Sequence, residues 1–318
     1  MLVRFWGTRG SLPVAFTSAD VQKKLVAALV QAAGRRLDTP ERARDFVTRE
    51  LEFSVSHTFG GNSSCVEIET GSGEYVLCDL GSGARVLGNH VLATRGPSGS
   101  TFHVFMSHLH WDHIMGFPFF MPAYIPGNRI RIYGGHAELE AAFRRQNAAP
   151  SFPVDFSKMG ATIEFEQLEP GRAYRIGGLS VRVKRQRHSG DSYGYRFERD
   201  GKVVVYSTDS EHKQDDPADA QSFVEFFAGA DLVIFDAMYS LADAVSVKED
   251  WGHSSNVVGV ELCQMARVRH LCLFHHEPIH DDERIAAILR ETQRLEEITR
   301  AGHRLAISAA WDGLEIAV

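Results

Sequence analysis

The chain has 318 residues, of which 44% are hydrophobic and 24% charged, and its formal net charge is −7. This composition is typical of an ordinary globular protein, and it excludes an intrinsically disordered chain, a collagen-like repeat and a disulfide-stapled miniprotein. Because neutralisation of phosphates by Lys and Arg dominates non-specific binding to polynucleotides, the acidic balance also argues against a stable complex with nucleic acid.

In chain order, the first predicted element is a strand at Leu2–Trp6, and two helices follow it. The segment Ser18–Ala33 carries apolar residues at helical spacing, and Gly34 follows it as a stop signal. Thr39-Pro40 then predicts the N-cap and first residue of a second helix, which ends near Leu51. These helices interrupt a start that is otherwise rich in strands.

The rest of the chain alternates between short strand-like runs, rich in β-branched and aromatic residues, and helical segments at 255–268 and 281–300. The further predicted strands are Ser64–Glu69, Tyr75–Asp79, Thr101–Met106, Ile130–Tyr133, Thr162–Gln167, Ser180–Arg185, Tyr193–Glu198, Lys202–Ser207, Leu232–Asp236, His270–His275 and Arg304–Ser308. This pattern predicts an α/β (α+β) architecture in a single domain over residues 1–318. We interpret residues 13–56 as a helical insertion, which either covers a site as a lid or only packs against the body.

The segment Thr101–His113 contains the residues best suited to chemistry. An apolar run is followed at once by His-x-His-x-Asp-His, formed by His108, His110, Asp112 and His113. If the two first histidines continue the strand, they project to the same side, and a tight turn brings the last two residues to the same place. Four ligands this close together suit two metal ions, and imidazole with carboxylate favours Zn, Mn or Fe over Ca or Mg.

This spacing resembles the signature of the metallo-β-lactamase superfamily. The resemblance implies a four-layer αβ/βα sandwich with a dinuclear metal site along one edge. It also implies three further ligands, which are matched by His188, Asp209 and His275, each following a predicted strand. The implied arrangement is one metal ion on His108, His110 and His188, a second on Asp112, His113 and His275, and Asp209 between them.

Two assignments near these ligands stay open. His275 is favoured as the last ligand because it ends a strand, but a shift of one residue would make His276 the ligand. Asp79, in the segment Cys78–Gly83, is expected to accept a hydrogen bond from a ligand imidazole and to fix its orientation. The alternative is that Asp79 only caps the glycine turn that follows it.

Finer motifs resemble the phosphodiesterase-like branch of the superfamily, which includes the tRNA 3′-processing endonucleases (RNase Z) and the phosphonate-pathway cyclic phosphodiesterase. The motifs are Phe5–Ser11, Gly60–Cys65, Cys78–Gly83, His188–Tyr195 and Trp251–Ser255. In those enzymes the histidine that matches His253 contacts the scissile phosphate. His253 also lies just before a helix start at Ser254 or Ser255, where free N–H groups favour an anion. The alternative is that His253 only caps the helix.

The resemblance therefore implies a dinuclear metal-dependent hydrolase, and the substrates we expect are small or cyclic nucleotide-type phosphodiesters. A metal-bridging hydroxide would attack phosphorus, with Asp112 and Asp209 holding the metal ions and His253 clamping the phosphate or protonating the leaving group. The alternatives are an RNase Z-like 3′-processing endoribonuclease, a hydrolase of lactones, thioesters or β-lactams, and a non-hydrolytic di-iron oxygen-sensing protein. Four cations close before His188 leave a local anion site open: Arg182, Lys184, Arg185 and Arg187.

The expected cofactors are two divalent metal ions, Zn or Mn with Fe as the alternative, and the expected partner is a small phosphodiester. Because relatives are commonly dimers, we also expect a homodimer. No apolar run is long enough to span a bilayer, and Met1–Trp6 lacks the apolar stretch of a signal peptide. The four cysteines show no paired spacing, so the expected location is the cytoplasm.

Overall fold

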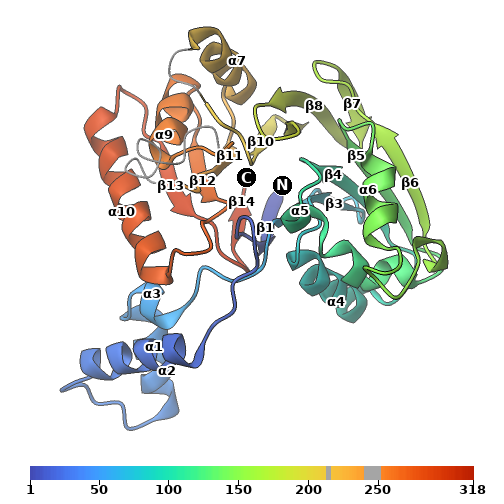
Figure 1. Ribbon diagram of the computed structural model, residues 1–318. Coiled ribbons are helices and arrows are strands. Elements are labelled where there is room, and N and C mark those ends of the chain that lie inside the picture. Colours follow the sequence, from blue (N-terminus) through green and yellow to red (C-terminus); the bar gives the residue numbers. More distant parts are fainter. Residues whose placement is uncertain (213–215, 240–251) are drawn as a thin grey trace.

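The computed structural model describes residues 1–212, 216–239 and 252–318, which form two seven-stranded sheets packed face to face (Figure 1). The first sheet has the order β14-β1-β2-β3-β4-β5-β6 and the second β13-β12-β11-β10-β9-β8-β7. The strands of the first sheet are β1 (Leu2–Gly7), β2 (Cys65–Glu69), β3 (Tyr75–Cys78), β4 (Thr101–Met106), β5 (Arg129–Gly134), β6 (Thr162–Gln167) and β14 (Glu315–Ala317). Those of the second are β7 (Ala173–Ile176), β8 (Leu179–Gln186), β9 (Ser192–Arg199), β10 (Lys202–Ser207), β11 (Leu232–Asp236), β12 (His270–Phe274) and β13 (Ala306–Ala309).

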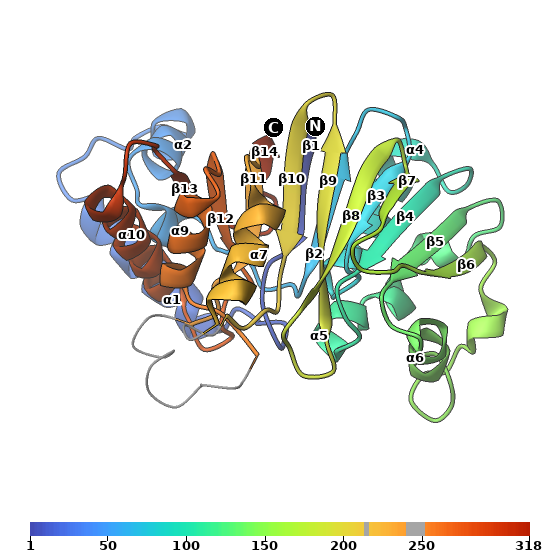
Figure 2. The same ribbon diagram turned by 90° about the horizontal axis from the view of Figure 1, so that it is seen from above.

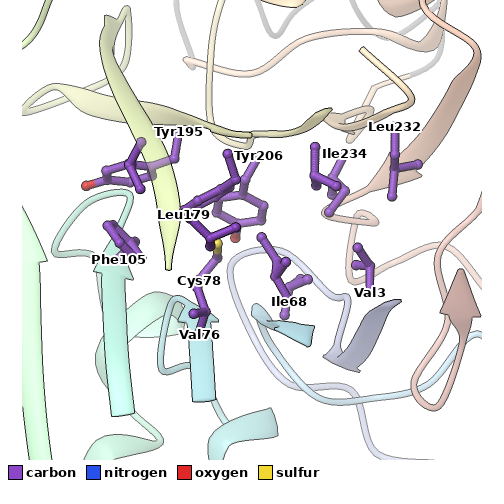
Figure 3. Packing of buried hydrophobic residues seen from close by; sticks show 14 of the residues in the cluster. Val3, Ile68, Val76, Cys78, Phe105, Leu179, Tyr195, Tyr206, Leu232 and Ile234 are labelled. Carbon is purple, nitrogen blue, oxygen red and sulfur yellow. The ribbon is translucent and has the colours of Figure 1, made fainter. Parts of the chain in front are cut away.

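Helices cover the outer face of each sheet, so the fold has four layers (Figure 2). On the first sheet lie α4 (Gly83–Arg95), α5 (Trp111–Ile114) and α6 (Leu139–Gln146), and on the second α7 (Pro217–Phe227), α9 (Asn256–Met265) and α10 (Asp282–Thr299). Between the sheets, Val3, Ile68 and Phe105 pack against Leu179, Tyr195 and Ile234 (Figure 3). The expected α/β sandwich is confirmed.

Each sheet changes from antiparallel to parallel pairing, and this change determines where loops meet. In the first sheet β3, β4, β5 and β6 run parallel, and in the second β10, β11, β12 and β13 do. The carboxyl ends of parallel neighbours lie at one edge of a sheet, so the loops after β3, β4, β10, β11 and β12 meet there. Six of the seven residues expected to bind metal lie in these loops. The seventh, His188, follows β8, which ends at the same edge because β8 and β10 both pair antiparallel with β9.

The predicted helical insertion is present as α1 (Ser18–Gln31), α2 (Pro40–Arg49) and α3 (Phe53–Ser56). Thr39 is the N-cap of α2 and Pro40 its first residue, as predicted. The apolar stripe of α1 is not buried, since Leu25 is 57% exposed. Ion pairs connect Lys23 to Asp281 and Glu283 at the start of α10, so the insertion packs beside that helix (Figure 1).

Some expectations about elements were incomplete or wrong. His108 and His110 do not continue the strand, because β4 ends at Met106 as predicted, so the alternation of side chains along a strand does not place these two histidines. Strands β7 and β14 and helices α4, α6 and α7 were not predicted. Helix α4 has a weak sequence signal because it contains two glycines, and Gly88 is needed since a Cβ there would lie 3.0 Å from the Phe120 ring. None of the helices in the described part of the chain is long and apolar enough to cross a membrane.

Arg9 connects three loops beside the sheet edge. The residue is 2% exposed, and its guanidinium donates to the carbonyl oxygens of Gly60 at 2.8 Å, His280 at 2.8 Å and Glu277 at 3.4 Å. A buried carbonyl without a donor costs free energy, so these bonds fix the loop after β12 against the end of β1.

We expect Arg9→Ala to lower the free energy of unfolding by about 2 kcal/mol or more, because it removes the guanidinium that donates to the buried Gly60 carbonyl and to the His280 carbonyl. Urea denaturation measures the change. Arg36→Ala is the matched control, since the Arg36 side chain is 78% exposed and should shift the midpoint little. Equal midpoints for the two variants would contradict this role of Arg9.

Candidate metal centre

The loops that follow strand ends bring seven histidine and aspartate side chains together. His108 and His110 follow β4, and the one-turn helix α5 supplies Asp112 and His113. The other strand ends supply the remaining three residues: His188 after β8, Asp209 after β10 and His275 after β12. All seven lie in two groups whose nitrogen and oxygen atoms are within 4.8 Å of one another.

The backbone at this edge is held in an uncommon conformation. Asp79, Asp209 and His275 have φ angles of 60°, 47° and 62°, in the left-handed region that non-glycine residues seldom adopt. Such strain costs about 1–3 kcal/mol per residue and persists where the surroundings enforce it, as they often do at functional sites. The fold therefore turns these three side chains sharply off the ends of their strands.

The first group consists of His108, His110 and His188. His188 Nε2 lies 3.1 Å from His110 Nδ1, and the rings of His108 and His188 have centroids 4.8 Å apart. Burial lowers the pKa of all three rings, and the neighbouring imidazoles lower it further. The rings are thus held neutral, which is the form that binds a metal ion.

The second group consists of Asp112, His113, His275 and Asp209. Nε2 of His113 lies 3.1 Å from Asp112 Oδ2, 3.3 Å from His275 Nε2 and 3.3 Å from Asp209 Oδ2. Burial by itself lowers the pKa of His113, yet the charges of Asp112, Asp209 and Asp79 raise it well above its usual value. The carboxylates therefore stabilise positive charge at this point.

Asp209 lies between the two groups. Its Oδ1 is 3.7 Å from His108 Nε2 and 3.9 Å from His188 Nε2 in the first group. In the second group, the same oxygen is 3.3 Å from His275 Nε2, and the other carboxylate oxygen, Oδ2, is 3.3 Å from His113 Nε2. One carboxylate thus faces both groups, as a ligand shared by two ions would.

Two observations show that these residues fit metal ions. Tetrahedral coordination with bonds of about 2.0–2.1 Å holds neighbouring ligand atoms about 3.3 Å apart. The second group has this spacing, with Asp112 Oδ2 3.2 Å from His275 Nε2. In the first group, His108 Nε2 is buried and has no hydrogen-bond partner among the described residues. A buried imidazole nitrogen without a partner costs free energy unless a metal ion binds to it.

Groups behind the histidines orient them. Asp79 is fully buried and accepts hydrogen bonds from His113 Nδ1, Ser107 Oγ and Tyr206 Oη, each at 2.7 Å. The Gly252 carbonyl accepts from His188 Nδ1 at 2.7 Å, which leaves Nε2 of that ring facing the first group. Such partners fix the tautomer and the ring plane of a ligand histidine.

We expect Asp79→Asn to weaken metal binding about 10- to 100-fold, since partners that orient a ligand histidine have effects of this size. Isothermal titration calorimetry of the metal-stripped variant with Zn²⁺ measures the change in affinity. Glu69→Gln is the control, because this carboxylate at the end of β2 is 41% exposed and pairs with Arg4 away from the ligand groups. Wild-type affinity in Asp79→Asn would show that Asp79 merely caps its turn.

His253 lies beside both groups, and its ring also comes within 4.8 Å of ligand atoms in two further sets, His188 with Asp209 and Asp236 with His275. Its Nδ1 donates to Asp236 Oδ2 at 2.9 Å and is 3.8 Å from Asp209 Oδ1, and its ring lies 5.1 Å from that of His188. Burial alone lowers the pKa of His253, but the charge of Asp236 and the hydrogen bond to it raise that pKa to about 9. The helix behind it, α9, has Ser255 as N-cap, two residues after His253.

Other residues singled out from the sequence lie elsewhere. His276 points away from the ligand groups, because its Nε2 donates to the Ala310 carbonyl at 2.8 Å. Trp251 of the motif that contains His253 lies outside the described residues. The four cations before His188 each have a partner: Arg182 pairs with Glu198, Lys184 donates to Ser222, Arg185 pairs with Asp191, and Arg187 lies 3.5 Å from Asp216.

Sequence reasoning missed three contributors to the site, one of which is the Gly252 carbonyl that orients His188. Asp236 ends β11, and β11 pairs in parallel with β10, which ends just before Asp209, so the two carboxylates leave neighbouring strands at one edge. That shared position was a usable signal. The backbone N–H of Ser11 donates to Asp112 Oδ2 at 2.8 Å, and a backbone donor has no sequence signal of its own.

A family model described as Beta-lactamase superfamily domain matches residues 75–276. Ribonuclease Z of Thermoplasma acidophilum is 23% identical over 244 residues, which cover 61% of this chain and 74% of that protein. Ribonuclease BN of Escherichia coli O1:K1 is 22% identical over 282 residues, which cover 73% of this chain and 88% of that protein.

Solved structures of similar fold cover nearly the whole chain. The metallo-beta-lactamase fold protein YhfI from Bacillus subtilis has a TM-score of 0.65 at 17% identity, covering 99% of this chain and 98% of its own. The short form of human tRNase Z has a TM-score of 0.60 at 18% identity, covering 100% and 99%. A diphosphatase from the PhnP family has a TM-score of 0.61 at 17% identity, covering 100% and 97%. At these identities the likeness shows the fold.

Proposed function

The chain belongs to the beta-lactamase superfamily, and on that basis we propose that it is a dinuclear metal-dependent phosphodiesterase acting on small or cyclic nucleotide-type phosphodiesters. The observation that carries the proposal is the position of Asp209, whose carboxylate faces both ligand groups while His253 stands beside them. Ribonuclease Z and a PhnP-family diphosphatase, proteins that this chain resembles, are named for the cleavage of phosphate bonds.

Two divalent ions, when bound, would lower the pKa of a water molecule and polarise the phosphoryl oxygens. In the proposal His108, His110 and His188 hold one ion, Asp112, His113 and His275 hold the other, and Asp209 contacts both. Asp79, Gly252 and the Ser11 N–H keep ligand atoms aimed at these positions. Zn and Mn are the ions we propose, with Fe as the alternative, since imidazole and carboxylate suit each of them.

His253 is the residue that favours phosphodiester chemistry. Its Nδ1 is bonded to Asp236, which leaves Nε2 for the substrate. A cationic imidazole held there binds a phosphoryl oxygen or gives a proton to the departing alkoxide. Hydrolysis of a thioester needs no such group, because a thiolate is stable enough to leave without a proton.

The proposed substrate is small rather than a polynucleotide. The net charge of −7 opposes accumulation along a phosphate backbone, and each of the four cations before His188 already has a partner. An RNase Z-like endoribonuclease is therefore the second candidate, favoured only by the likeness to ribonucleases Z and BN.

The experiment is a comparison of bis(p-nitrophenyl) phosphate, a thioester and a lactone as substrates of the metal-loaded protein, with chelator-treated protein as the control. We expect turnover of the diester that disappears with the metal, and cyclic nucleotides would be screened next. Turnover of the thioester or the lactone without turnover of the diester would overturn the phosphodiesterase proposal and leave the metal centre in place.

A further inference from the structure

Trp111 is exposed to solvent and does not contribute to the hydrophobic packing of the fold. It stands in the chain between His110 and Asp112, and 79% of its surface is exposed. The two other described tryptophans are packed, since Trp6 donates its indole N–H to Glu67 and the Trp311 ring lies 5.5 Å from that of Phe53. In the described ranges Trp111 has no hydrogen bond from its indole N–H and no contact with another ring.

The backbone of Trp111 is nevertheless fixed. Its carbonyl accepts from the Met115 N–H at 2.7 Å within α5, and the next three residues of that helix, Asp112, His113 and Ile114, are buried. His110, one residue before, is exposed as well. The indole is therefore exposed on a segment whose backbone is held in place and which supplies the neighbouring ligands His110, Asp112 and His113.

A second exposed apolar side chain follows a residue that contacts the ligand Asp112. The Ser11 N–H donates to Asp112, so the chain on either side of Ser11 passes α5, and Leu12 there is 57% exposed. The cations near His188 are engaged with their own partners, as described above. The segments that contact the centre thus carry an exposed aromatic side chain and an exposed apolar one, which suit the uncharged, flat part of a ligand.

We propose that Trp111 is the platform on which a flat heteroaromatic group of the substrate, such as a nucleobase, stacks while the phosphodiester lies at the metal centre. This inference rests on the proposed phosphodiesterase function and names the residue that selects among diesters. Every nucleobase can stack on an aromatic side chain, because each has a π-face. Trp111 would therefore select diesters that carry an aromatic group, without distinguishing one base from another.

The test compares thymidine 5′-(p-nitrophenyl) phosphate with methyl p-nitrophenyl phosphate, which share a leaving group and differ in the base. In Trp111→Ala we expect the ratio of kcat/KM for the thymidine ester to that for the methyl ester to fall about 5- to 100-fold, the effect of losing one stacked base. Trp111→Phe should keep most of the ratio. Phe119→Ala, at a side chain that is 54% exposed and packs on Phe152 outside the site, should leave it unchanged.

An equal loss with both esters, or an unchanged ratio, would overturn the assignment of Trp111. A dimer that dissociates in Trp111→Ala while the ratio stays constant would show instead that Trp111 contacts a second copy, and would overturn it too. If the wild type hydrolyses neither ester, the proposed function fails. Stacking is then decided by tryptophan fluorescence, where adenosine 5′-monophosphate should quench the wild type but not Trp111→Ala, and ribose 5-phosphate should quench neither.

Discussion

Replacement of Asp209 by Ala is expected to reduce diester hydrolysis to the level of the metal-free protein. The carboxylate is 1% exposed and lies within 3.3–3.9 Å of imidazole nitrogens from both ligand groups. Without it, neither group keeps the ligand that the two ions would share, and their positive charges would face each other without the carboxylate between them. The measurement is turnover of bis(p-nitrophenyl) phosphate together with the metal content of the purified variant.

Asp200→Ala is the matched control for this substitution. Asp200 has a φ of 52°, close to that of Asp209, and follows a strand in the same way, but its side chain is 86% exposed. The two variants therefore impose a similar backbone strain, while only one removes a carboxylate from the site. A metal-replete Asp209→Ala protein with full activity would refute the bridging role.

The second large effect is expected from His253→Ala. We expect kcat to fall about 10²- to 10⁴-fold, the range for loss of a group that transfers a proton in the transition state. The metal content should stay at the wild-type value, because the seven predicted ligands form two groups that do not include His253. This separation of activity from metal binding distinguishes His253 from the seven predicted ligands.

Two further variants sharpen this result. Asp236→Asn removes the charge beside His253 but keeps a hydrogen-bond acceptor, so its activity should lie between those of the wild type and His253→Ala. His57→Ala changes an exposed histidine that stacks on Phe53, and should have wild-type activity. If His253→Ala loses its metal ions along with its activity, the residue acts as a ligand and the proposed role in proton transfer is wrong.

The sequence predicted the strands better than the helices, because the strands have a signal in their own residues. Strands such as Thr101–Met106 are continuous apolar runs bounded by polar residues, and β4 has these bounds in the structure. The helix α4 contains Gly83 and Gly88 where a good helix former would give a signal, because tertiary packing needs the space at those positions. Packing requirements of this kind cannot be read from periodicity.

The site follows a similar division. The candidate ligands were predicted from their order along the chain, and the structure brings them within reach of one another because parallel strands end at one edge. The Gly252 carbonyl orients His188, the Ser11 N–H orients Asp112, and Asp236 orients His253 beside them; these hydrogen bonds depend on the fold of distant segments. The homodimer and the cytoplasmic location stay predictions.

The most direct measurement of the central claim is a titration of the metal-stripped protein with Zn²⁺ or Mn²⁺, in which bound ions per chain and turnover of bis(p-nitrophenyl) phosphate are determined on the same samples. Two ligand groups sharing Asp209 predict two ions per chain and a turnover that is absent from the stripped protein and reaches its full value when both ions are bound. Full turnover with a single ion, or turnover without any, would contradict a dinuclear phosphodiesterase.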